Sequence, residues 1–267
     1  MKTHALMWVQ TICICAHFIL TGCARNPGDS RETLHIAAAA DLQFVMQELI
    51  TQFKQDHPQW NIEVSYGSSG QFYAQLMNRA PFDIFFSADM RYPRALAEAG
   101  YADINELFPY AVGRIVVWAL KDTPIDLADL EIKALLHPAA AKVAIANPRH
   151  APYGVAAEEA MRNLGLYDEV APRLVFGENI AQAAQFIESG AADIGIIALS
   201  LAIAPALAEQ GVYWEIPLEY FPRMDQAGII LPWAHPREAA DAFRAYVLSD
   251  TGRAVLRAYG FYMPGDF

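Results

Sequence analysis

The chain has 267 residues and a formal net charge of −11 at neutral pH, from 19 Lys and Arg against 30 Asp and Glu. This acidic balance argues against binding to nucleic acid or to an acidic membrane through a general positive field. Because 54% of the residues are hydrophobic, a chain of this length can form one large core or two lobes.

The N-terminal segment resembles a lipoprotein signal peptide. Lys2 precedes an apolar stretch, Ala5–Leu20, that is short for a membrane-spanning helix. The run L-T-G-C that ends at Cys23 is similar to a lipobox, whose cysteine is lipidated and becomes the new N-terminus. We predict a signal peptide over residues 1–22, lipidation at Cys23 and a tether over residues 23–32. A plain secretory signal or an uncleaved anchor remains an alternative.

The predicted folded region contains no cysteine, because Cys13, Cys15 and Cys23 all lie in the leader. Disulfides and cysteine-ligated metals are therefore excluded there. The histidines are scattered without the spacing of a metal site, so we expect neither a cation site nor a cofactor.

Short apolar runs alternate with amphipathic stretches along the rest of the chain, which is typical of an α/β protein. Strands are predicted at residues 34–40, 62–66, 83–87, 111–119, 142–146, 173–176, 194–198 and 213–216. Helices are predicted at residues 42–57, 71–78, 92–99, 127–136, 154–164 and 180–189, with closing helices over 236–258.

Polar or glycine-containing segments follow four of these strands. They are Asp41, the G-S-S-G turn at 67–70, the N-P-R-H-A-P-Y-G turn at 147–154, and G-E-N-I at 177–180. Ligands bind at the carboxyl ends of parallel strands, so these segments are candidates for one site. Two segments are early and two are late, which favours two lobes that face each other across a cleft.

The turn from Gly67 to Gly70 has the features of an anion-binding loop. Its glycines expose backbone N–H groups, Ser68 and Ser69 add hydroxyl donors, and the helix that follows directs its positive dipole end at the turn. The turn contains no Lys or Arg, which suits a small oxyanion that is held and later released. Taken alone, the turn favours a simple helix N-cap, because Gly/Ser turns are common.

Several segments together resemble the periplasmic molybdate-binding proteins, the substrate-binding components of molybdate ABC transporters. In order, they are I-A-A-A-A-D-L, Y-G-S-S-G-Q-F-Y, A-P-F-D-I-F-F-S-A-D, N-P-R-H-A-P-Y-G, G-E-N-I-A-Q-A, A-D-I-G-I-I-A-L-S and the terminal Y-G-F. The resemblance implies a two-lobed type II periplasmic binding protein fold, with a mixed, mostly parallel sheet flanked by helices in each lobe. Lobe I is expected at residues 33–110 and 226–267, and lobe II at 111–225.

The resemblance also implies an oxyanion site made of neutral donors. It assigns the hydroxyl and N–H of Ser69, the hydroxyl of Tyr153 and the backbone N–H of Ile180 to the anion. Asp41 stands where relatives carry Ser or Asn, and Ala198 stands where some members place a tyrosine. A carboxylate about 4 Å from a dianion repels it by several kcal/mol. Asp41 therefore offers only its N–H, or is protonated in the bound state, or the ligand differs.

The function implied by the resemblance is that of a binding protein and not of an enzyme. We expect a monomeric lipoprotein in the periplasm or on the outer face of the envelope, which captures molybdate or tungstate and delivers it to an ABC permease. Alternatives are binding of another oxyanion such as sulfate, a sensory role, or a serine hydrolase that uses Ser68 or Ser69 with His150 and Asp41. The chain lacks the G-x-S-x-G motif that a hydrolase of this kind requires.

Overall fold

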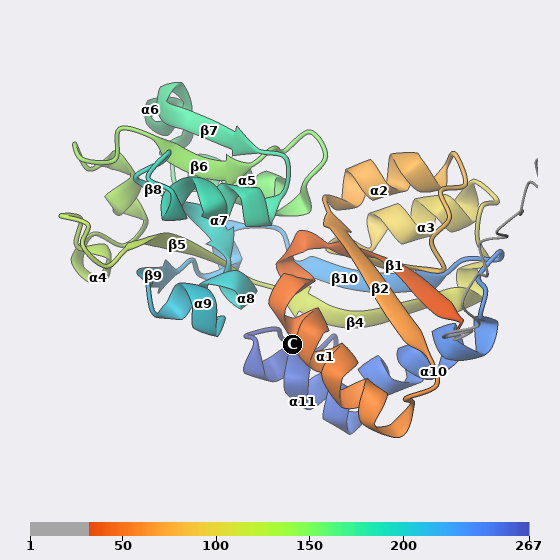
Figure 1. Cartoon of the computed structure of the whole chain (residues 1–267). Coiled ribbons are helices and arrows are strands. Elements are labelled where there is room, and N and C mark those ends of the chain that lie inside the picture. Colours follow the sequence, from red (N-terminus) through yellow and green to blue (C-terminus); the bar gives the residue numbers. More distant parts are fainter. Residues whose placement is uncertain (1–31, 267) are drawn as a thin grey trace, which may run out of the picture. The chain divides into compact units, whose positions relative to one another are not determined.

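The computed structural model describes residues 32–266, which belong to one compact unit. The predicted signal peptide, the lipidation site Cys23 and nearly all of the tether lie outside the described residues. Within the described part there are two five-stranded sheets, each covered by helices (Figure 1).

The first sheet has the strand order β2-β1-β3-β10-β4. Its strands are β1 (Thr33–Ala39), β2 (Asn61–Gly67), β3 (Ile84–Ser87), β4 (Leu107–Gly113) and β10 (Met224–Ile230). β1 is parallel to β2 and β3, whereas β10 is antiparallel to both β3 and β4.

The second sheet repeats this arrangement with the order β7-β6-β8-β5-β9. Its strands are β5 (Ile115–Leu120), β6 (Val143–Ala146), β7 (Leu174–Gly177), β8 (Ile194–Ala198) and β9 (Gly211–Glu215). β6 is parallel to β7 and β8, whereas β5 is antiparallel to β8 and β9. The fourth position of each sheet is therefore taken by an antiparallel strand.

Helices cover both faces of the first sheet. The α-helices of the chain are α1 (Gln43–Asp56), α2 (Ser69–Leu76), α3 (Arg91–Glu98), α4 (Leu127–Leu130), α5 (Pro152–Asn163), α6 (Tyr167–Val170), α7 (Ile180–Glu188), α8 (Leu199–Ala202), α9 (Pro205–Ala208), α10 (Arg237–Leu248) and α11 (Asp250–Ala258). Figure 1 shows α2 and α3 on one face of the first sheet and α1, α10 and α11 on the other. Two separate apolar clusters fill these faces, and a third, larger one forms the core around the second sheet.

The chain passes between the sheets twice. The first passage is at Arg114, between the end of β4 and the start of β5, and the second lies between Glu215, which ends β9, and Met224, which starts β10. In each case the strand that follows the passage is the antiparallel one. We therefore propose residues 32–113 with 224–266 as lobe I and 115–216 as lobe II.

The predicted single strand over residues 111–119 is wrong. It contains the end of β4 and most of β5, which belong to different sheets. Both parts are buried and apolar, and only Gly113 and Arg114 separate them, so the sequence pattern did not reveal the passage. For the same reason, the predicted lobe boundary after residue 110 lies inside β4.

The sequence interpretation also omitted β10 and the short helices α6, α8 and α9. β10 reads M-D-Q-A-G-I-I and mixes polar and apolar residues without alternation, so the predicted boundary after residue 225 falls inside it. The three helices have four residues each, which is too short for a helical repeat to show. Among the described helices, none has the length and hydrophobicity needed to cross a membrane.

Gly154 allows α5 to begin close to the end of β6. A Cβ atom at this position would lie 2.2 Å from the backbone oxygen of Ala146. Alanine usually stabilises a helix by about 1 kcal/mol relative to glycine. Because the backbone must shift to relieve the overlap, we expect Gly154→Ala to lower the free energy of unfolding by about 1–3 kcal/mol instead.

Urea denaturation of this variant would measure the change. Gly265→Ala is a matched control, because a Cβ atom there would meet nothing within 4 Å. A Gly154→Ala protein as stable as the control would show that the contact is relieved without cost.

Candidate functional site

A small buried cavity lies where strand ends of the two sheets meet. Its lining comes from the segments that follow β1, β2, β3, β6 and β7. The lining residues are Ala39, Ala40, Asp41, Gly67, Ser68, Ser69, Ala88, Ala151, Pro152, Tyr153, Asn179 and Ile180. Its volume is about 10 Å³, which is close to the space that one water molecule needs.

The structure brings all four predicted binding residues to this cavity. Asp41, Ser69, Tyr153 and Ile180 are at most 3% exposed and all line it. They come from both sheets, since Asp41 and Ser69 follow β1 and β2, whereas Tyr153 and Ile180 follow β6 and β7.

Ser69 and Ile180 are the first residues of α2 and α7. Their backbone N–H groups therefore have no acceptor within their own helices. The side chain of Ser68 caps α2 by accepting from Gln71, and Asn179 caps α7 in the same way. The Ser69 hydroxyl oxygen accepts from the N–H of Ala88 at 3.0 Å, so its own proton is available to another acceptor. These groups form a set of neutral donors at two helix N-termini.

Tyr153 does not present a free hydroxyl proton in this structure. Its hydroxyl donates to Oδ2 of Asp41 at 3.0 Å and accepts from Nε2 of Gln226 at 3.1 Å. A tyrosine has only one hydroxyl proton, and here that proton is directed at Asp41. The contact of Tyr153 with an anion stays a prediction, and in this arrangement Asp41 accepts the proton that such a contact would use.

Gln226 is the main residue of the site that the sequence interpretation missed. It lies on β10, is 0% exposed, and donates to Oδ2 of Asp41 at 2.8 Å. Its other amide atom, Oε1, accepts from the hydroxyl of Tyr110 at 2.8 Å, and this hydroxyl also lies 3.2 Å from the backbone oxygen of Ser87. The sequence interpretation did not predict strand β10, so no sequence pattern pointed to this glutamine.

Asp41 has hydrogen bonds on only one of its two carboxyl oxygens. Oδ2 accepts from Tyr153 and Gln226, whereas Oδ1 is buried and has no partner among residues 32–266. Burial raises the pKa of Asp41 to about 6, and the hydrogen bonds from Gln226 and Tyr153, with a smaller effect of the residue's own backbone N–H, offset only part of this rise. The backbone oxygen of Asp41 also accepts from the hydroxyl of Ser200 at 2.8 Å.

Further hydrogen bonds join α2 to the second sheet's loops beside the cavity. The N–H of Gly70 donates to the backbone oxygen of His150 at 2.9 Å. Ser68 Oγ lies 2.8 Å from Nδ1 of His150, and the amide of Gln71 donates to Glu178 at 2.8 Å. These contacts hold the predicted anion loop against the opposite half of the site.

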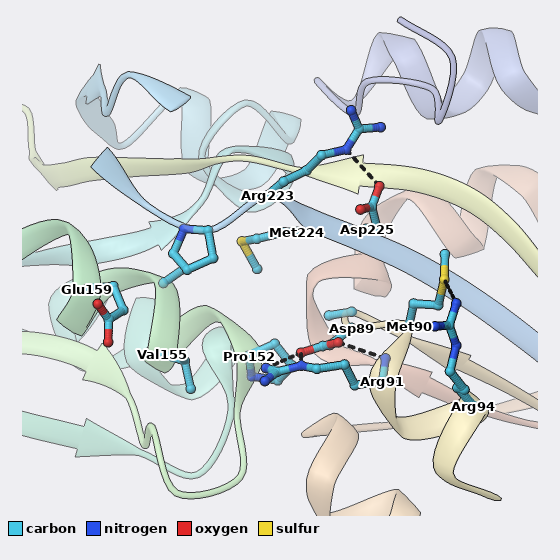
Figure 2. Close-up of a pocket in the computed structure, with 13 residues that line it drawn as sticks. Asp89, Met90, Arg91, Arg94, Pro152, Val155, Glu159, Arg223, Met224 and Asp225 are labelled. Atoms are coloured by element: carbon cyan, nitrogen blue, oxygen red, sulfur yellow. Dashed lines mark hydrogen bonds and ion pairs between the residues drawn. The ribbon is translucent and has the colours of Figure 1, made fainter. Parts of the chain in front are cut away.

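A wider, open cleft of about 610 Å³ adjoins the small cavity and shares Ala88 and Pro152 with it. Figure 2 shows charged side chains around this cleft, including Arg91 paired with Asp89. Side chains of both charges therefore line this cleft. In the described part of the chain there is no cluster of His, Cys, Asp or Glu that could hold a metal ion.

Asp41 has a consequence for stability that depends on pH. Because burial raises its pKa from 3.8 to about 6, the folded state binds more protons than the unfolded state between these values. This group's contribution to the free energy of unfolding therefore falls by about 3 kcal/mol as the pH rises through that window, and is constant above it.

Asp41→Asn removes the titration, so we expect the variant to gain about 2 kcal/mol over the wild type between pH 4 and pH 7. Urea unfolding at both pH values, without added oxyanion, would measure this gain. Asp129→Asn, at an exposed position, is the control. A difference between Asp41→Asn and wild type that is equal at both pH values would contradict the expectation.

Comparison with known proteins identifies relatives with the same architecture. Residues 34–262 match the bacterial extracellular solute-binding protein family. The chain is 33% identical to the molybdate-binding protein ModA of Azotobacter vinelandii over 244 residues, which cover 91% of this chain and 93% of that protein. It is 36% identical to the molybdate-binding protein ModA of Rhodobacter capsulatus over 200 residues, which cover 75% and 77%.

The solved structure of the A. vinelandii periplasmic molybdate-binding protein matches with a TM-score of 0.81 and 32% sequence identity, over 86% of this chain and 99% of that one. The match confirms the predicted two-lobed α/β fold of type II periplasmic binding proteins. The resemblance drawn from the sequence motifs is also confirmed, and this chain belongs to the bacterial extracellular solute-binding proteins.

Proposed function

We propose that this chain captures molybdate or tungstate outside the cytoplasm and delivers it to the permease of an ABC transporter. The observation that carries the proposal is the convergence of Asp41, Ser69, Tyr153 and Ile180 on one buried cavity. Relatives named for molybdate binding, at 33% and 36% identity, support the choice of anion.

The chemistry of the cavity suits a small oxyanion that carries no proton. The hydroxyl of Ser69 and the N–H groups of Ser69 and Ile180 donate hydrogen bonds, and the N-termini of α2 and α7 add favourable dipoles. Phosphate carries a proton at neutral pH, and at the Ser69 and Ile180 groups this proton would face another donor. No Lys or Arg lines the cavity, so release does not require the breaking of an ion pair.

The proposed transport role includes the predicted lipid anchor and the predicted monomeric state. A lipid on Cys23 would keep the protein at the periplasmic or outer face of a membrane, near its permease. The tether over residues 23–32 would give the folded body freedom to dock. The bonds between α2 and the loops of the second sheet would close the lobes over the anion.

The alternative of a serine hydrolase has one observation in its favour, because Ser68 Oγ lies 2.8 Å from Nδ1 of His150. Two features argue against it. Ser68 is 3% exposed and caps α2, and Asp41 bonds Tyr153 and not His150. Turnover of an ester that is lost in Ser68→Ala would revive this alternative.

Isothermal titration calorimetry with molybdate, tungstate, sulfate and phosphate tests the proposal directly. We expect tight binding of the first two anions and weak or no binding of the others, because size and protonation differ among them. No binding of any of the four anions would reject the proposed function. Preferential binding of sulfate would make sulfate the ligand in place of molybdate.

Ser69→Ala is expected to weaken molybdate binding by about 1.5–3 kcal/mol, because it removes a hydrogen bond to a charged ligand. The same calorimetric titration measures the change. Ser65→Ala is the matched control, since Ser65 is an exposed residue of the preceding strand β2. An unchanged dissociation constant in Ser69→Ala would remove this residue from the site.

Cys23→Ala is expected to move the protein from the membrane fraction to the soluble fraction of the cell envelope, because no lipid can then be attached. Fractionation of cells that express the full chain, followed by immunoblotting, would show the distribution. Retention of the variant in the membrane fraction would favour an uncleaved anchor.

A further inference from the structure

The hydrogen bonds around Asp41 all lead to the same carboxyl oxygen. Tyr110 donates to Gln226, Gln226 donates to Oδ2 of Asp41, and Tyr153 donates to the same Oδ2. Oδ1 receives nothing, although it is buried and Asp41 lines the cavity. A proton on this carboxyl group therefore belongs on Oδ1, where it becomes the donor of a hydrogen bond.

We propose that Asp41 takes up one proton from solvent when the oxyanion binds, and that its Oδ1–H then donates a hydrogen bond to an oxygen of the anion. This inference rests on the proposed function and adds to it a coupling between anion binding and pH. Gln226 acts as a positioning residue, because it holds the carboxyl group through Oδ2 and leaves Oδ1 for the anion.

The groups that face Asp41 include no positive charge that could keep it ionised beside an anion. They are Tyr153 from α5, Tyr110 from β4, Gln226 from β10, Ser200 from α8, and the helix starts at Ser69 and Ile180. Burial raises the pKa of both Tyr110 and Tyr153 well above 10, so these hydroxyls stay neutral over the physiological range. Asp41 is thus the group in this network that can change its charge near neutral pH.

An anion in the cavity favours the neutral form of Asp41 still more strongly. In the free protein, burial raises the pKa of Asp41 to about 6, so the group is mostly ionised at pH 7.5. A dianion beside it raises this pKa further, because two like charges at close range repel each other. The proton taken up removes the repulsion and supplies one more donor to the anion.

Linkage fixes the direction of the pH effect. Between the pKa of the free protein, about 6, and the higher pKa of the complex, only the complex holds the proton. The dissociation constant for molybdate is therefore expected to rise about tenfold for each pH unit in this range. Near pH 7.5, about one proton should be taken up for each anion bound.

Calorimetric titration of the wild-type protein with molybdate, in Tris and in HEPES at pH 7.5, measures the proton uptake from the difference in apparent enthalpy. Titrations at pH 6, 7 and 8 measure the slope of the dissociation constant. Infrared difference spectra on addition of molybdate should show the carbonyl stretch of a protonated carboxyl group. These three measurements on the wild type do not depend on the folding of any variant.

The variant Asp41→Asn tests whether Asp41 is the residue that takes up the proton. The amide can accept from Gln226 and Tyr153 through its oxygen and donate to the anion through its nitrogen at every pH. We expect this variant to bind molybdate with no proton uptake, no infrared band and more tightly than the wild type at pH 8. The control Asp129→Asn, at an exposed position, should behave as the wild type does.

The outcomes separate this inference from the proposed function. Tight binding of molybdate without proton uptake, or uptake that persists in Asp41→Asn, would overturn the role of Asp41 and leave the function intact. Stronger binding of phosphate than of molybdate would mean that Oδ1 accepts a proton from the ligand, which also overturns the inference. No binding of molybdate or tungstate at any pH would reject the proposed function itself.

Discussion

Polar groups that are removed from water need hydrogen-bond partners, and this requirement governs the region where the two sheets meet. Asp41, Ser69 and Gln226 are almost completely buried there, and their partners come from both sheets. The unpartnered oxygen of Asp41 and the N–H groups at the starts of α2 and α7 are the exceptions. An oxyanion in the cavity would meet these exceptions together, which makes the ligand part of the hydrogen-bond arrangement of the closed protein.

The topology explains why donors from distant parts of the chain converge. Each sheet has three adjacent parallel strands whose carboxyl ends point to the cavity, and each has an antiparallel strand that enters from the other sheet. β10 is one of these entering strands, and it carries Gln226 into contact with Asp41. The second passage between the sheets therefore also supplies part of the site.

Asp41 distinguishes this chain from the pattern that its sequence resembles. A carboxyl group among neutral donors would repel an anion if it stayed ionised, yet its surroundings contain two tyrosines and a glutamine and no cation. The proposed protonation makes Asp41 neutral, as its neighbours are, so that it no longer repels the anion. It also predicts that the strength of binding depends on the pH outside the cell membrane, which a site made only of serine or asparagine would not show.

The sequence by itself determined the alternation of strands and helices, because hydrophobic periodicity is a local property, and the four segments that supply the cavity, because they follow recognisable strand ends. It also determined the family, through motifs whose order matches known proteins. Only the tertiary structure decided that the apolar run at residues 111–119 is divided between two sheets, that β10 inserts into the first sheet, and that Gln226 and Tyr153 both bond Asp41. These features depend on contacts between residues more than 70 positions apart, and no local pattern of side chains records such contacts.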